Sequence, residues 1–348
     1  MGAFYEFVEK VTSLERSGRK ITKLHIGDTN MPAPKCAKEA AEKSMQEDGS
    51  GYGSGAGLME LREKIARREK CGVENVVVGP GSKHILYALL SVLGKGKKVV
   101  FPSPHWPAYH LACEQLGLQA VPVQTSMEEN WQFGELPLEG AKMLLICNPL
   151  NPTSTVYGKE LVESTIESAS RKNVPVVIDE AYKGLAHEPI GNYDAIRVRS
   201  FSKEFSMEGW RLGYAIAPKE IAQKIISFNQ VTSTCVPIFV QKAGIACLEN
   251  EKEILEGANK IWRARLKAAA EALNDAGFSY AMPQAGIYAF ATHEKMEDAW
   301  EFANRALEKG VAVSAGSEFG EYGKFVRICL NQEESVLRDA ILKMGECV

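Results

Sequence analysis

One short segment of the chain combines residue types that could bind a carbonyl compound together with a phosphate group. Lys203 follows a β-like run at residues 195–199, Ser200 precedes it by three residues, and Arg211 follows it by eight. A lysine amine can form a Schiff base with a carbonyl cofactor, and a hydroxyl and a guanidinium can hold that cofactor's phosphate. Most lysines are instead solvated surface groups, so the segment is interpreted together with the rest of the chain.

A second set of candidates lies where apolar runs end. Asp179 ends the run 174–179, and Tyr182 follows three residues later. A carboxylate at the end of a buried strand is costly unless it is paired, and open α/β sheets bind ligands at the carboxyl ends of their strands. Asn151 follows the run 142–147 in a double-proline turn, as either a plain turn residue or a fixed hydrogen-bond donor. We therefore predict functional roles for Asp179 and Tyr182.

A glycine turn offers a place for a phosphate group. Three valines at 76–78 predict a buried strand, Gly79-Pro-Gly81 predicts a tight turn, and the residues from His84 onward predict a helix. Free backbone N–H groups at such a helix start bind phosphate, although an ordinary strand-to-helix turn has the same pattern. The spacing is not that of a Walker loop.

Two further segments carry side chains that could face a ligand. The glycine-rich segment 51–57 lacks the preceding strand that a dinucleotide-binding loop requires, so it is interpreted as a flexible loop in which Tyr52 could present its hydroxyl. Trp106 follows a predicted strand at 97–102. Its indole is either a core group or a stacking surface for a flat ring.

The spacing of apolar residues predicts two structural units. Strands alternate with helices of about ten to fifteen residues until about residue 218, which indicates a mainly parallel α/β sheet covered by helices. Residues 219–276 are chiefly helical, with a break expected at Gly257, and the last hundred residues indicate a smaller α+β unit. We expect a large domain at 37–250 and a small domain made of 1–36 and 251–348.

Composition and charge limit the classes of partner. The chain has 348 residues, more than one core usually supports, and its net charge of −3 gives no reason to expect nucleic acid or an anionic membrane as a partner. Its eight cysteines are scattered, which is typical of reduced thiols in an intracellular protein. No stretch approaches eighteen apolar residues and no early basic region precedes an apolar stretch, so we expect neither a membrane span nor a signal peptide. Six dispersed histidines do not suggest zinc. We expect a cytoplasmic protein without a metal centre.

Four motifs, in this order, resemble those of the fold-type I pyridoxal-phosphate (PLP) enzymes, and more narrowly the class I/II aminotransferases of the aspartate aminotransferase group. They are Asn-Pro-Leu-Asn-Pro-Thr at 148–153, Asp-Glu-Ala-Tyr at 179–182, Ser-Phe-Ser-Lys at 200–203 and Trp-Arg-Leu-Gly at 210–213. The resemblance covers nearly the whole chain. It departs from the family pattern at Ser154, where glycine is usual, and at Ala315, where proline is usual.

The resemblance implies a role for each candidate near the cofactor. Lys203 would form the internal aldimine with PLP and then move the proton between the substrate's Cα and the cofactor's C4′. Asp179 would pair with the pyridine nitrogen and keep it protonated. Tyr182 and Asn151 would hydrogen-bond the phenolic oxygen, and Trp106 would stack on the ring.

The same resemblance implies how the phosphate and the substrate are bound. The phosphate would be held by Gly81, Ser82, Ser200 and Arg211, with Lys83 beside them. Tyr52 would reach the phosphate of the neighbouring subunit, which implies a homodimer with shared active sites. The substrate would be bound by Gly27, Lys83, Trp106, Asn151 and Arg327, with the arginine gripping the α-carboxylate.

The resemblance defines the reaction better than the substrate. Lys83 occupies the position of a lysine that reads the distal carboxylate in some aspartate aminotransferases, or it is simply solvated at the helix start. L-aspartate or L-glutamate with a 2-oxo acid is therefore the leading prediction. Aromatic amino acids, histidinol phosphate, and C–S β-lyase or decarboxylase chemistry on the same fold remain open. The complete set of site residues disfavours a non-catalytic PLP-fold protein, and the missing strand disfavours a nicotinamide enzyme.

Overall fold

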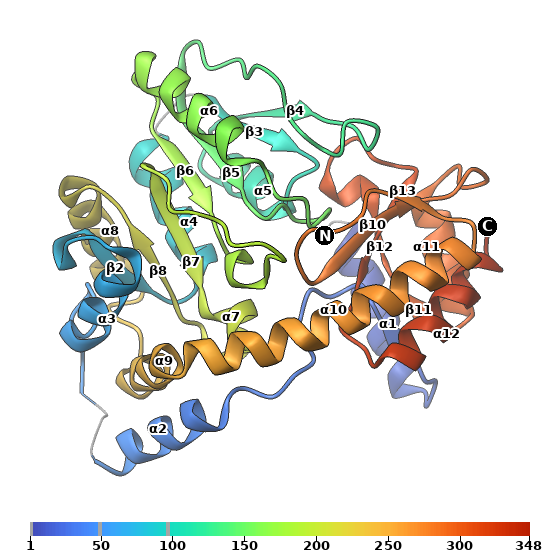
Figure 1. Cartoon of the computed structure of the whole chain (residues 1–348), viewed down its shortest axis with the longest axis horizontal. Helices are drawn as coiled ribbons and strands as arrows, with labels where there is room; N and C mark the ends of the chain where they lie inside the picture. Colours follow the sequence, from blue (N-terminus) through green and yellow to red (C-terminus); the bar gives the residue numbers. More distant parts are fainter. Residues whose placement is uncertain (1–2, 48–50, 95–97) are drawn as a thin grey trace.

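A seven-stranded sheet forms the centre of the larger part of the molecule (Figure 1). The computed structural model describes residues 3–47, 51–94 and 98–348; Met1, Gly2 and Lys97, which fall within predicted segments, lie outside these ranges. The spatial order is β2 (Val76–Gly79), β8 (Gly213–Ile216), β7 (Ile196–Ser200), β6 (Val176–Asp179), β5 (Ala141–Cys147), β3 (Lys98–Ser103) and β4 (Gln119–Gln124). β8 is antiparallel to β2 and β7, and the other neighbouring pairs are parallel. The predicted mainly parallel α/β sheet is confirmed.

Burial explains why these runs form strands. All residues of β2, β6 and β7 are buried, and the three strands are rich in valine and isoleucine. β-branched side chains pack well in a sheet that is covered on both faces, where parallel strands are found. β4, by contrast, lies at the edge of the sheet and is only partly buried. Its Pro122 is tolerated there because an edge strand can spare an N–H donor.

Helices belong to the same part of the molecule as this sheet, and those between β2 and β8 in the sequence carry the chain from one strand to another (Figure 1). They are α2 (Lys35–Gln46), α3 (Met59–Glu69), α4 (Ser82–Leu93), α5 (Pro107–Gln115), α6 (Lys159–Arg171), α8 (Lys219–Thr232) and α9 (Ile238–Glu249). A long helix, α10 (Glu251–Asp275), then leads to the smaller unit. The predicted break at Gly257 is wrong, because α10 continues through that residue. A helical glycine costs about 1 kcal/mol, which burial of Trp262 and Leu266 on the same helix outweighs.

The smaller unit joins the two ends of the chain. Its four-stranded sheet has the order β12 (Ser314–Ala315), β13 (Phe325–Cys329), β10 (Tyr288–Thr292) and β9 (Ser279–Tyr280), and β1 (Thr22–Lys23) pairs with β11 (Val311–Ala312). The remaining helices of this unit are α1 (Ala3–Arg16), α11 (Ala299–Glu308) and α12 (Glu334–Gly345) (Figure 1). Phe7 and Val11 of α1 share a hydrophobic core with Phe302 and Leu337. The N-terminal arm therefore packs as part of the C-terminal unit.

Candidate active site

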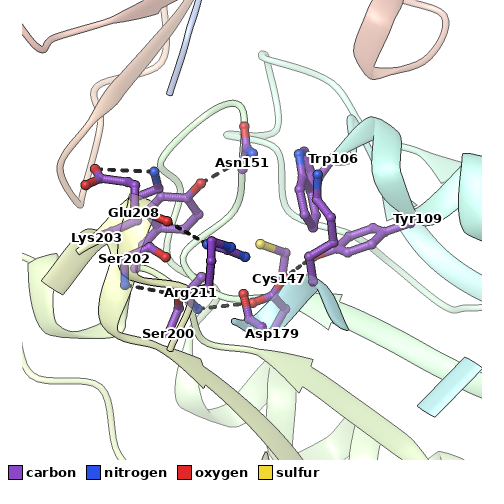
Figure 2. Close-up of a pocket in the computed structure, with 14 residues that line it drawn as sticks. Trp106, Tyr109, Cys147, Asn151, Asp179, Ser200, Ser202, Lys203, Glu208 and Arg211 are labelled. Atoms are coloured by element: carbon purple, nitrogen blue, oxygen red, sulfur yellow. Dashed lines mark hydrogen bonds and ion pairs between the residues drawn. The ribbon is translucent and has the colours of Figure 1, made fainter. Parts of the chain in front are cut away.

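A cavity of 380 Å³ opens at the carboxyl ends of β5, β6 and β7, beside the starts of α4 and α5 (Figure 2). Nine of the residues predicted from the sequence line it: Ser82, Lys83, Trp106, Asn151, Asp179, Tyr182, Ser200, Lys203 and Arg211. Parallel strands bring their carboxyl ends to one edge, which explains how side chains up to 129 positions apart along the chain meet here. The cavity has two chemically different ends: one holds a lysine and a carboxylate, and the other a helix start with an arginine.

Lys203 lies in the short helix α7 (Phe201–Glu204), directly after β7. Ser200 caps this helix, because its Oγ accepts a hydrogen bond from the N–H of Ser202 at 3.1 Å. The Lys203 amine donates to the carbonyl of Gly27 and lies 3.5 Å from a carboxylate oxygen of Glu208. Burial lowers the pKa of the Lys203 amine, and the carboxylate of Glu208 partly offsets this shift. A lowered pKa increases the neutral fraction of the amine, which is its nucleophilic form.

Gly27 is the predicted substrate-site residue nearest to this lysine. A Cβ at this position would overlap the hydroxyl of Tyr288. Glycine therefore permits the close approach of the 27–28 backbone that brings its carbonyl to Lys203.

Asp179 ends β6 and is buried at the floor of the cavity. Its Oδ2 accepts a hydrogen bond from the Tyr109 hydroxyl at 2.6 Å, and its Oδ1 accepts one from the N–H of Ala181 at 3.1 Å. Burial raises the pKa of Asp179 to about 6, although these two hydrogen bonds oppose the shift. Among the described residues, no lysine or arginine forms an ion pair with this carboxylate. The position is therefore ready for a cationic group brought by a ligand.

The raised pKa of Asp179 predicts a pH-dependent stability of the protein without cofactor. Between its unfolded value of 3.8 and its folded value of about 6, the folded state keeps a proton that the unfolded state has released. The free energy of unfolding should therefore fall as pH rises through this window, by about 3 kcal/mol, and then level off. Urea unfolding at pH 4 and pH 7.5 should show this slope in the native protein and a smaller one in Asp179→Asn. Equal slopes in both proteins would contradict the assignment.

The opposite end of the cavity has the features of a phosphate site. Gly81, with a φ of 86°, precedes Ser82 at the start of α4, and no side chain caps this helix. Arg211 has a left-handed φ of 58°, and its guanidinium donates to the carbonyls of Glu208 at 2.7 Å and Pro80 at 3.3 Å. A Cβ on residue 81 would overlap that guanidinium, so glycine permits the close approach. Uncapped N–H groups at a helix start together with a fixed arginine suit a phosphate dianion.

Arg327, on β13 of the smaller unit, lines an adjoining cavity that shares Lys83 and Trp106 with this one. Its Nη1 donates to Oδ1 of Asn151 at 3.2 Å, and its Nη2 donates to the carbonyl of His25 at 2.8 Å. The guanidinium lies over the rings of Tyr288 and Phe319, at 4.4 and 4.8 Å from their centroids. Its buried Nε has no hydrogen-bond partner among the described residues. A held guanidinium with a spare donor is suited to a carboxylate ligand.

A pair of hydroxyls joins this arginine to the floor of the site. Asn151 Nδ2 lies 3.5 Å from the hydroxyl of Tyr182, which in turn lies 3.1 Å from the hydroxyl of Tyr288. Burial raises the pKa of Tyr182 well above its usual value, so this residue is a neutral donor at physiological pH. Tyr182 and Asn151 therefore present donors to any anionic oxygen placed between them.

Lys83 and Trp106 form one wall of the cavity. The Lys83 amine lies 4.9 Å from the centroid of the Trp106 ring, and the ring packs edge-on against Tyr109 at 5.6 Å. Burial lowers the pKa of Lys83, with a smaller contribution from Arg211. The indole thus lies in the cavity wall (Figure 2), where its face is available to a flat ring.

Tyr52 lies outside this cavity. Its side chain is 90% exposed and lines a separate hollow with Met45, Cys235 and Ile238. This position does not bring Tyr52 to the phosphate site of its own chain.

Tyr109, Glu208 and Tyr288 were not singled out from the sequence. Tyr109 follows Trp106 by one helical turn, and Glu208 lies between the segments that carry Lys203 and Arg211. For Tyr109 and Glu208, closeness to motif residues in the sequence is the only signal that could have indicated a place in the site. Tyr288 lies on β10, and nothing in its sequence context indicates that its hydroxyl meets that of Tyr182.

Within 3–47, 51–94 and 98–348, no three histidine, cysteine or acidic side chains form a group that could hold a metal ion. In the same part of the chain, no helix has the length and apolarity needed to span a membrane. The eight cysteines are free thiols, as their scattered spacing predicted.

Comparisons with known proteins agree with this geometry. The family model described as aminotransferase class I and II matches residues 19–343. An aspartate aminotransferase of Thermococcus kodakarensis is 33% identical over 94% of this chain and 88% of its own length. An aspartate/prephenate aminotransferase of Thermus thermophilus is 30% identical over 95% of this chain and 92% of its own length. A solved structure of the Thermus thermophilus aspartate aminotransferase with maleate has a TM-score of 0.94 at 28% identity, covering 100% of this chain and 97% of that one.

The family, the fold and the lysine-centred cavity lead to one conclusion. Enzymes of this family and fold depend on PLP, and the named relatives are aminotransferases. The chain is therefore a PLP-dependent aminotransferase with the fold type I architecture, and it belongs to the aminotransferase class I and II family.

Proposed function

We propose that this enzyme transfers the amino group of L-aspartate or L-glutamate to a 2-oxo acid, with Lys203 as the residue that bonds PLP and moves the substrate proton. One observation carries the proposal. The cavity holds an amine of lowered pKa, a buried carboxylate without a cationic partner among the described residues, and an uncapped helix start with an arginine. These groups match the aldehyde, the ring nitrogen and the phosphate of PLP.

The residues present therefore fit PLP. Ser82, Ser200, Arg211 and the N–H groups that follow Gly81 would hold the phosphate. Asp179 would pair with the ring nitrogen, and Trp106 would stack on the ring. When bound, PLP supplies a conjugated ring that accepts the electron pair left when the Cα–H bond of the substrate breaks.

The chain's own groups then handle the proton and the charge. The Lys203 amine, neutral in part because of its lowered pKa, would take the proton from the substrate's Cα and deliver the same proton to C4′ of the cofactor. Glu208 and the Gly27 carbonyl hold this amine in place between these tasks. Tyr182 and Asn151, whose hydroxyl and Nδ2 lie 3.5 Å apart, would donate to the anionic oxygen of the bound ring and so stabilise that anion.

Arg327 is proposed to bind the α-carboxylate of the substrate. Arg327→Ala should raise KM for the amino acid about 100-fold, because a buried carboxylate would lose its charged partner, and should change kcat less. Arg327→Lys should recover only part of this loss, because an ammonium cannot bind a carboxylate through two parallel donors. The matched control is Arg338→Ala, which removes an exposed arginine paired with Asp275. A KM unchanged in Arg327→Ala would contradict the assignment.

The Lys83 amine is proposed to bind the distal carboxylate of an acidic substrate and so to favour such substrates. Two named relatives above are aspartate aminotransferases, and an amine in the cavity wall, 4.9 Å from the centroid of the Trp106 ring, supports the same preference. Lys83→Ala should lower kcat/KM for L-aspartate and L-glutamate about tenfold, the loss of one charge-assisted hydrogen bond. For L-alanine it should change little. A panel of amino acids assayed with 2-oxoglutarate or oxaloacetate tests this, and equal losses for all of them would contradict the role.

An aromatic substrate is the second candidate, because of an adjoining cavity of 490 Å³. It shares Lys83, Trp106 and Arg327 with the substrate site and is lined by Leu111 and Phe319, which suit a large flat side chain. The Thermus relative is named for prephenate as well as aspartate, and prephenate, although not aromatic, carries a six-membered ring that is consistent with a large side-chain site. The same amino-acid panel includes phenylalanine and histidinol phosphate. Release of ammonia without a 2-oxo acid acceptor would instead indicate a β-lyase.

The assembly and the domain division belong to the same proposal. The exposed Tyr52 is available to complete the phosphate site of a second copy, which supports a homodimer with shared active sites, and sedimentation equilibrium tests it. The large domain, 37–250, carries Lys203, and the small domain, 1–36 with 251–348, carries Gly27 and Arg327. Eight free thiols support a reducing compartment such as the cytoplasm.

A further inference from the structure

A group of charged side chains is buried behind the segments that carry Lys203 and Asp179. It consists of three acids and three bases: Glu69, Glu180, Glu204, Lys183, Arg197 and Arg199. Each of the six is at most 9% exposed, and we name them the buried charge cluster. The two arginines come from alternate positions of β7, so both point to the same face of the sheet.

Three site residues each have a sequence neighbour in the buried charge cluster. Arg199 precedes Ser200, Glu180 follows Asp179, and Glu204 follows Lys203. Successive side chains of a strand point to opposite sides, so the ends of β6 and β7 direct one residue into the cavity and its neighbour into the cluster. Lys203 and Glu204 are consecutive in the short helix α7, where neighbouring side chains also point in different directions. Members of the buried charge cluster are thus adjacent in sequence to three of the groups that would face PLP.

Glu204 makes the contacts that join these segments. Its Oε1 accepts from Nη2 of Arg199 at 2.6 Å, so this ion pair brackets the four residues Ser200–Lys203. The same oxygen accepts from the N–H of Gly184 at 2.8 Å, in the turn that follows Tyr182. Its Oε2 accepts from Arg68 at 3.0 Å. Glu204 therefore connects the turn carrying Lys203 directly to the turn carrying Tyr182.

The backbone at Gly184 and the side chain of Glu204 are packed closely against each other. A Cβ on Gly184 would lie 2.9 Å from Cδ of Glu204, so residue 184 approaches as closely as a glycine can. Replacing a buried ion pair with apolar side chains is often neutral for stability, so stability alone gives little reason for charges here. A fixed distance between two catalytic segments gives a better reason, since a displacement of about 1 Å can cost 100-fold in rate.

We propose that Glu204 is a positioning residue. Through its contacts with Arg199 and the Gly184 N–H, it fixes the position of Lys203 relative to Asp179 and Tyr182. The inference rests on the proposed function, because it needs Lys203 to bond PLP. It concerns the geometry of the site and adds no group that touches the substrate.

Glu69 provides a matched control. It is 3% exposed against 2% for Glu204, and it too contacts Arg68 and Arg199. It lies at the end of α3, however, and has no neighbour among the cavity residues. Glu69→Gln and Glu204→Gln should therefore both lower Tm, whereas only the second should displace Lys203.

The decisive readout is the fraction of bound PLP that borohydride fixes to Lys203, measured by peptide mass spectrometry. Glu204→Gln should lower the equilibrium constant for this bond, and kcat, about 10- to 100-fold, with KM for the amino acid unchanged because Arg327 is untouched. Glu69→Gln should keep the native fraction. If Glu204→Gln does not fold, Gly184→Ala, which retains every charge, should show the same loss.

The outcomes separate this inference from the proposed function. No bond between PLP and Lys203 in the unaltered protein would overturn the proposed function and this inference with it. A normal bond in the unaltered protein, with native fractions in Glu204→Gln or in Gly184→Ala, would overturn the positioning role alone. Equal losses in Glu69→Gln and Glu204→Gln would overturn it as well, because they would show a general structural role.

Discussion

Replacing Lys203 with alanine is expected to lower kcat at least about 10,000-fold, the upper range for loss of a positioned acid–base group. Two amines of lowered pKa line the cavity, and of these only Lys203 lies between the Gly27 carbonyl and the carboxylate of Glu208, whereas Lys83 lies beside Trp106. PLP should still bind, because the phosphate end of the cavity, with Ser82 and Arg211, is unchanged. Dialysis should then remove it more easily than from the native enzyme.

Two companion variants sharpen this test. Lys203→Arg keeps a positive charge but cannot bond the aldehyde, so it should be as inactive as Lys203→Ala. Lys83→Ala removes the other amine that lines the cavity and should leave turnover of neutral amino acids intact. Near-native turnover in Lys203→Ala would show that Lys203 is not the reactive amine. Loss of all turnover in Lys83→Ala would assign that role to Lys83 instead.

Asp179→Asn is expected to lower kcat about 1,000-fold, the scale seen when one buried electrostatic partner of a transition state is removed. The amide keeps the hydrogen bond from Tyr109 but cannot stabilise a protonated ring nitrogen, so the ring accepts electrons poorly. Asp179→Glu, which retains the charge, should recover part of the activity. Single-turnover absorption measurements with L-glutamate give the rate directly.

A different result for Asp179 would be equally informative. If Asp179→Asn transferred amino groups at close to the native rate, the buried carboxylate would be structural, and its raised pKa would reflect burial alone. Tyr109→Phe serves as a control, because it removes the 2.6 Å hydrogen bond and leaves the charge. It should cost far less than Asp179→Asn.

Much of the site could be predicted from the sequence because its residues follow apolar strands. Asp179 and Asn151 come directly after β6 and β5, and parallel strands bring such positions to one edge. Lys203 and Arg211 lie within one short segment, so local spacing was enough to associate them. The role of Arg327 came from family resemblance, since nothing local links β13 to a strand end more than a hundred residues earlier.

The residues that were missed owe their positions to tertiary packing. Glu208 reaches Lys203 across a loop, and Tyr288 reaches Tyr182 from the other unit of the molecule. The failed prediction at Gly257 has a similar cause, because burial of the rest of α10 outweighs the low helix propensity of one glycine. Glu204 follows the motif lysine directly, but its contacts to Arg199 and Gly184 are visible only in the folded chain.

The most direct test of the central claim is an absorption spectrum of the purified protein with PLP, recorded before and after L-glutamate is added in the absence of any 2-oxo acid. We expect the band of lysine-bound PLP to convert to that of the aminated cofactor, and addition of oxaloacetate to restore it. In Lys203→Ala, neither the first band nor the conversion should form at a comparable rate. A native protein whose spectrum does not change with PLP, or whose PLP band no amino acid converts, would contradict the assignment of Lys203 and of aminotransfer.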